Sequence, residues 1–125
     1  MIQAKGLTFP KNKPQKARID CFSQSSIKYF YGSYKKNEKT QDPKWNINFD
    51  IDLFRASTLK FVLYSTKILS KDEYIGQVEI DLQDFFTQET GKQIISNHNI
   101  SHEFQYLISP QNSHLILSFK NTRCN

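Results

Sequence analysis

The sequence predicts an all-β fold, a sandwich built from eight antiparallel strands. Between Trp45 and Leu53, apolar residues alternate with polar ones, which is the period of a half-buried strand. Valine, isoleucine, phenylalanine and tyrosine are plentiful and alanine is scarce, a composition that favours strands. Similar segments recur along the 125 residues with turn signals between them, the pattern of a single-domain sandwich.

The first half of the chain holds four of the expected strands. Pro10 and Pro14 place a loop after the first strand, and Gly32 predicts a bulge or bend within the third. Asp42-Pro43 is a turn signal before the fourth, because a residue that precedes proline is pushed out of the helical region. These strands are expected at residues 1–7, 17–22, 27–34 and 45–53.

The second half holds the other four expected strands. A polar loop from Ser65 to Tyr74 separates the fifth strand from the sixth, and the polar residues 87–101 are expected to form an irregular loop. These strands are expected at residues 59–63, 78–82, 104–108 and 115–119. The predicted core consists of the large apolar residues Trp45, Phe49, Ile51, Leu59, Phe61, Val78, Ile80, Leu115 and Leu117.

Residues 40–76 follow an extended motif: Thr-x-x-Pro-x-Trp-Asn-x-x-Phe at the start of a strand, then a leucine that opens the next strand, then Ile-Gly. It is carried by Thr40, Pro43, Trp45, Asn46, Phe49, Leu59, Ile75 and Gly76. In order and spacing, this motif resembles the C2 domain, a family of calcium- and lipid-binding β-sandwiches. The resemblance implies a Greek-key topology of the family's type II, in which the first and last strands are neighbours.

The expected domain spans residues 1–125. The chain opens abruptly on its first strand, so either that strand is short or the domain is excised from a larger protein.

Calcium-dependent C2 domains bind the ion with aspartates from two loops, because calcium takes six to eight oxygen ligands. The resemblance places two of those aspartates where this chain has Ser65 and Lys67. The first-loop aspartate is replaced by residues 14–16, Pro-Gln-Lys. Asp72 and Glu73 remain as vestigial, solvated loop acids. We therefore expect weak or absent calcium binding and no cofactor.

Charge is unevenly distributed along the chain and predicts an anionic partner. Residues 1–44 carry a balance of +7 and residues 45–125 a balance of −2, within a total of +5. The expected lipid-binding lysines are Lys28, Lys35, Lys36, Lys39 and Lys60. A second expected contact is a membrane loop of two aliphatic residues between two lysines, Lys67, Ile68, Leu69 and Lys71.

Several other function classes lack support in the sequence. The glycines are too scattered for a phosphate-binding loop, the three histidines lack zinc-site spacing, and the basic residues lack a nucleic-acid-binding motif. No apolar run is long enough to span a membrane, and no signal peptide opens the chain. Cys21 and Cys124 are expected to be free thiols in a reducing compartment.

The sequence thus predicts a non-enzymatic, calcium-independent C2 module in the cytoplasm. Its expected function is peripheral membrane targeting through phosphatidylserine or phosphoinositides, without nucleic acid. The alternative is a protein–protein interaction or scaffold domain that does not bind lipid. Such a domain would have a dispersed lysine face and would expose an aromatic edge, such as Tyr29 to Tyr34.

Overall fold

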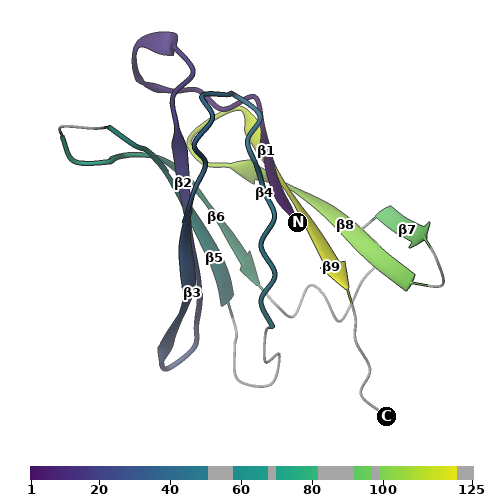
Figure 1. Ribbon diagram of the computed structural model, residues 1–125. Coiled ribbons are helices and arrows are strands. Elements are labelled where there is room, and N and C mark those ends of the chain that lie inside the picture. Colours follow the sequence, from purple (N-terminus) through teal and green to yellow (C-terminus); the bar gives the residue numbers. More distant parts are fainter. Residues whose placement is uncertain (51–57, 68–69, 82–91, 97–98, 121–125) are drawn as a thin grey trace.

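The computed structural model describes residues 1–50, 58–67, 70–81, 92–96 and 99–120, which form two packed antiparallel β-sheets (Figure 1). A short 3-10 turn, η1 (Pro10–Asn12), lies between the first two strands. The strands are β1 (Ile2–Lys5), β2 (Ala17–Gln24), β3 (Lys28–Lys35), β4 (Lys44–Trp45), β5 (Thr58–Ser65), β6 (Glu73–Asp81), β7 (Lys92–Ser96), β8 (Asn99–Ile108) and β9 (Ser113–Lys120).

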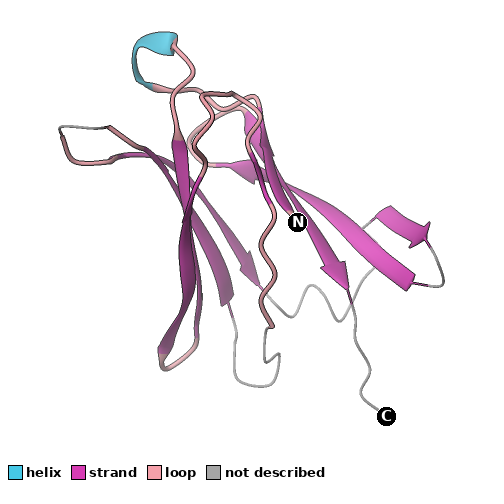
Figure 2. Cartoon of the chain, in the orientation of Figure 1, coloured by secondary structure: helices cyan, strands magenta, loops and turns pink. Residues whose placement is uncertain are grey.

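One sheet has the strand order β4-β1-β9-β8-β7 and the other the order β3-β2-β5-β6 (Figure 2). The predicted antiparallel sandwich is confirmed, and so is the pairing of the first strand with the last, with Ile2 opposite Leu117. β7 is an addition to the eight expected strands. It lies within residues 87–101, which were predicted to form an irregular loop because they are polar. Backbone pairing with β8 makes this segment a strand. No helix in the described part of the chain is long and apolar enough to cross a membrane.

β4 is much shorter than the strand predicted from the alternation after Trp45. Trp45 pairs with Ile2 at the beginning of β1, so the residues that follow have no β1 partner and form no ladder. The side chains nevertheless alternate, with Ile47 and Phe49 packed against the core and Asn46 exposed. The sequence therefore predicted the faces correctly and the hydrogen bonding incorrectly. Residues 51–53 lie outside the described residues.

The core lies between the sheets and contains most of the residues predicted for it. Seven of the nine are almost fully buried: Trp45, Leu59, Phe61, Val78, Ile80, Leu115 and Leu117. Phe49 is partly buried against this cluster, and Ile51 lies outside the described residues. On β5 the inward residues Leu59, Phe61 and Leu63 come from strict alternation, so this strand lines the centre of the sandwich.

The Ile75-Gly76 step lies where β6 of one sheet comes close to the end of β8 in the other. A Cβ atom built on Gly76 would lie 2.5 Å from Ile108 Cγ2 and 3.2 Å from the Ser109 carbonyl oxygen. The neighbouring Gln77 exchanges two backbone hydrogen bonds with Ser109, at 2.9 and 3.0 Å. Glycine is therefore required here because β8 occupies the space of a side chain.

Cys21 is a free, fully buried thiol on β2, as predicted. Burial, followed by the nearby Asp20 carboxylate, raises the pKa of this thiol to about 12. It therefore stays protonated at neutral pH and acts as a small core residue rather than a nucleophile. Cys124 lies outside the described residues.

Truncation of Phe61 tests the packing. Because its ring is enclosed by both sheets, Phe61→Ala is expected to lower the free energy of unfolding by about 3–5 kcal/mol. Phe30→Ala, which removes an exposed ring, should change it by less than about 0.5 kcal/mol. Equilibrium denaturation in urea measures both variants. Equal losses would show that Phe61 does not occupy the core.

Candidate functional site

The β1–β2 and β5–β6 loops, in which calcium ligands were sought, are joined by hydrogen bonds. The buried Ser65 hydroxyl donates to Gln15 Oε1, and Gln15 Nε2 donates to the Pro10 carbonyl oxygen at 3.0 Å. The backbone N–H and the hydroxyl of Thr66 both donate to the Lys16 carbonyl oxygen, at 2.9 and 3.2 Å. The oxygen atoms of Gln15, Ser65 and Thr66 therefore take part in hydrogen bonds that join the two loops.

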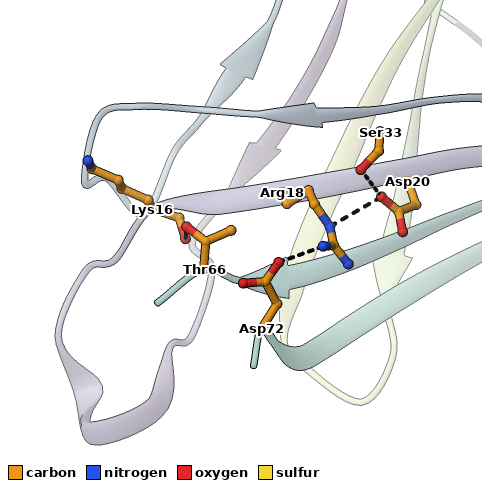
Figure 3. Close-up of polar contacts among 6 residues, drawn as sticks. All are labelled: Lys16, Arg18, Asp20, Ser33, Thr66 and Asp72. Atoms are coloured by element: carbon orange, nitrogen blue, oxygen red, sulfur yellow. Dashed lines mark hydrogen bonds and ion pairs between the residues drawn. The ribbon is translucent and has the colours of Figure 1, made fainter. Parts of the chain in front are cut away.

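Asp72 is bound by a cation of the protein itself (Figure 3). Arg18 Nη1 on β2 lies 2.5 Å from Asp72 Oδ2. Arg18 Nε lies 3.3 Å from Asp20 Oδ1. This Asp20 oxygen also accepts a hydrogen bond from the Ser33 hydroxyl. The guanidinium stacks over the Tyr64 ring, 4.2 Å from its centroid. Both members of the Arg18–Asp72 pair are largely shielded, with side chains 24% and 19% exposed.

Glu73 is paired as well, since its Oε2 lies 3.0 Å from Lys67 Nζ. The prediction of a solvated loop acid is wrong for Asp72, which is largely shielded beside Arg18, whereas Glu73 is exposed and lies beside Lys67. Among the described residues, no group of three or more His, Cys, Asp or Glu side chains is placed to hold a metal ion. Lys71 is exposed, and the predicted insertion residues 68 and 69 lie outside the described residues.

A groove of about 390 Å³ lies between the edge strands β3 and β4, which belong to different sheets. Three lysines lie around it, Lys35 and Lys36 from the end of β3 and Lys44 from β4. No acid in the described part of the chain lies within ion-pair distance of these lysines. The complete lining is Ser33, Tyr34, Lys35, Lys36, Lys44, Trp45, Asn46 and Ile47.

Backbone hydrogen bonds place the two sides of this groove. The Lys36 N–H donates to the Ala17 carbonyl oxygen at 2.9 Å and holds the end of β3 against β2. On the other side, the Pro43 carbonyl oxygen accepts from the Ala4 N–H at 3.0 Å. The Asp42 carboxylate accepts from the N–H of Gly6, which has a left-handed φ of 71°. Lys44 is thus fixed facing the end of β3.

Trp45 lines the same groove and carries an unsatisfied buried donor. Its ring is buried, and its Nε1–H has no hydrogen-bond partner among the described residues. A buried N–H group without a partner is costly, by about 1–3 kcal/mol. The N–H is itself buried with the ring, so what the groove presents to an anion is its three lysines.

The remaining predicted lysines lie elsewhere. Lys28 on β3 and Lys60 on β5 lie over the Phe22 ring on the outer face of their sheet, with Nζ atoms 4.2 and 5.8 Å from its centroid. Lys39 is exposed in the β3–β4 loop. The structure therefore brings Lys35 and Lys36 together with Lys44, which sequence reasoning missed. The sequence signal that could have identified Lys44 was its position next to Trp45, on the polar side of the alternation.

The chain belongs to the C2 domain family, whose model matches residues 1–97. It is also similar to the FT-interacting protein 1 of Arabidopsis thaliana, with 30% identity over 90 residues. The match covers 70% of this chain and 11% of that protein, so the chain spans about a tenth of the length of its curated relative. C2 domains are generally modules that bind lipids or proteins.

Double-mutant cycles on the two loop ion pairs test whether these loops are held by the protein's own cations. For Arg18→Met with Asp72→Asn we expect a coupling free energy of about 1–2 kcal/mol, because the pair is shielded and short. For Lys67→Met with Glu73→Gln, side chains 39% and 48% exposed, we expect about 0.2–1 kcal/mol. Urea denaturation measures both cycles. Zero coupling for Arg18–Asp72 would contradict the assignment.

Proposed function

We propose that this domain is a non-enzymatic C2 module that binds anionic phospholipids without calcium and acts as a peripheral membrane-targeting unit in the cytoplasm. The observation that carries the proposal is the groove between β3 and β4, which Lys35, Lys36 and Lys44 line together with Trp45. The proposed ligand is a phosphate-bearing headgroup, either phosphatidylserine or a phosphoinositide.

The chemistry of the groove suits a phosphate group. Ammonium groups attract phosphate as point charges, and the three groove lysines are not ion-paired with any acid of the described residues. Each lysine near an anionic leaflet contributes about 1 kcal/mol, so three lysines give a weak attraction. Exposed charges are screened over about 10 Å at 0.1 M ionic strength, so this attraction must fall with salt.

Calcium independence is supported by what the loop acids already bind. Asp72 contacts Arg18 and Glu73 contacts Lys67, so a calcium ion would have to displace two cations of the protein. Ser65 and Gln15 use their oxygens on each other. The proposal is therefore that the internal cations Arg18 and Lys67 neutralise this end of the domain in place of calcium.

Charge reversal in the groove tests the lipid site. Lys35→Glu, Lys36→Glu and Lys44→Glu combined should abolish most of the salt-sensitive binding to phosphatidylserine or phosphoinositide vesicles, because the headgroup loses its counter-charges. Liposome co-sedimentation at low and high salt measures this. The control is Lys5→Glu, Lys11→Glu and Lys13→Glu, which makes the same net charge change at exposed lysines outside the groove. Equal losses of vesicle binding in the two triple variants would show that only the net charge matters, and would overturn the groove as the lipid site.

Calcium titration tests the second part of the proposal. Isothermal titration calorimetry should show no heat of calcium binding, and the melting temperature should not rise with calcium. Vesicle binding should be the same in calcium and in chelator, because lysines rather than a metal contact the headgroups. A micromolar site that disappears in Asp72→Asn would contradict the proposal.

A protein-docking module is the second candidate, and one observation favours it. Tyr29 and Phe30 on the edge strand β3 are exposed, as a protein-docking aromatic edge would require. The rest of that predicted edge is absent, because Tyr31 stacks on Phe49 with ring centroids 4.6 Å apart and Tyr34 also packs against the core. If the wild-type domain ignores anionic vesicles even at low salt, protein docking becomes the better proposal.

A further inference from the structure

The tip of the β2–β3 hairpin displays an unusual concentration of exposed apolar side chains. Ile27, Tyr29 and Phe30 are 76%, 64% and 56% exposed. They account for half of the large apolar residues that are exposed in the described part of the chain, the others being Met1, Tyr74 and Leu107. Ser25 N–H donates to the Ile27 carbonyl oxygen at 3.2 Å, which closes the turn and places Ile27 at the tip.

The shape of this tip explains why its side chains find no cover. Tyr29 pairs with Ser23 and Phe30 with Phe22, so the two aromatic side chains lie on opposite faces of the hairpin. Both aromatic side chains on β3 are exposed, although their partners Ser23 and Phe22 on β2 are buried. In Figure 1 the hairpin lies at the opposite end of the sandwich from η1. Exposed apolar side chains at the end of a hairpin are suited to entering a lipid bilayer.

The charges around the tip are predominantly positive. Lys28 lies between Ile27 and Tyr29, and its ammonium group lies over Phe22 with that of Lys60 nearby. The acids on this face are Asp20 on β2, which contacts Arg18 and Ser33 towards the other end of β3, and two acids on β6, where Glu79 is opposite Lys60 and Asp81 is opposite Thr58. β6 is separated from β3 by β2 and β5. The hairpin tip therefore combines exposed apolar side chains with nearby lysines.

We propose that the β2–β3 hairpin inserts Ile27, Tyr29 and Phe30 into the interfacial layer of an anionic bilayer, with Lys28 contacting headgroups. This inference rests on the proposed lipid-binding function and adds the apolar contact that the groove lacks. Tyrosine suits this layer because its ring is apolar and its hydroxyl can remain hydrated. Lysine buries its stem while its ammonium group reaches the headgroups.

The location of the hairpin also defines a docking orientation. β3 begins at Lys28 beside the apolar tip and ends at Lys35 beside the basic groove. Its eight residues span roughly 27 Å when extended, so both contacts lie along one edge of the sandwich. The domain then lies with its β3 edge on the membrane, rather than standing on the β5–β6 loop, where Lys67 is already paired with Glu73.

The first test compares Ile27→Asp with the matched variant Leu107→Asp, which places the same charge at a 59% exposed residue on β8. The probe is phosphatidylcholine vesicles containing phosphatidylserine, at low and high salt. Ile27→Asp should reduce the partition coefficient about tenfold or more at low salt and remove the binding that persists at high salt, because apolar burial is not screened. Leu107→Asp should bind like the wild type, and unchanged melting temperatures exclude misfolding.

The second test measures insertion directly. Ile27→Trp and Leu107→Trp are each mixed with the same vesicles containing brominated phosphatidylcholine, which quenches tryptophan fluorescence within the bilayer. The residue-27 variant should be quenched more strongly than the residue-107 variant, and the native Trp45 provides the same background in both.

The possible failures are distinguishable. If the wild type does not bind at low salt, the proposed function and the hairpin insertion both fail. If the wild type binds and Ile27→Asp binds equally well, or if the two tryptophan variants are quenched equally, only the insertion is overturned. The exposed tip would then be assigned to a protein partner.

Discussion

The attachment of residues 41–45 to β1 is the contact on which the candidate site depends. Backbone hydrogen bonds join Leu7 to Gln41 and Ala4 to Pro43, and Trp45 is buried in the core directly after them. This attachment carries the chain from the end of β3 in one sheet to the edge of the other. Without it, Lys44 would not face Lys35 and Lys36, and the two sheets would have no basic groove between their edges.

The distribution of ion pairs separates structural cations from available ones. Arg18 on β2 neutralises Asp72 of the β5–β6 loop in a shielded pair, and Lys67 neutralises Glu73 in an exposed pair at the same end of the domain. The groove lysines have no such partner among the described residues. A net charge of +5 therefore says less about binding than the positions of the unpaired lysines along β3.

The residues that identify the family are structural in this chain. Pro43 and Trp45 fix β4 against β1, and Gly76 admits β8 where a side chain would collide. Such residues predict the fold well because each satisfies a local backbone or packing requirement that is visible in a single sequence. They do not predict the ligand, since in the described part of the chain none of them carries a charge toward the groove.

The sequence alone determined the sandwich, the inward face of most strands and the core, because alternation with period two is a local property. From the resemblance to the family, it also predicted that the usual calcium-ligand positions are replaced. Only the tertiary structure decided which charges are used internally, since Arg18 and Asp72 are 54 residues apart and meet across two strands. The same holds for the groove, whose lysines come from two sheets, and for the hairpin tip. Whether the side chains of the hairpin tip are exposed depends on how far the core extends between the sheets, which no local sequence pattern specifies.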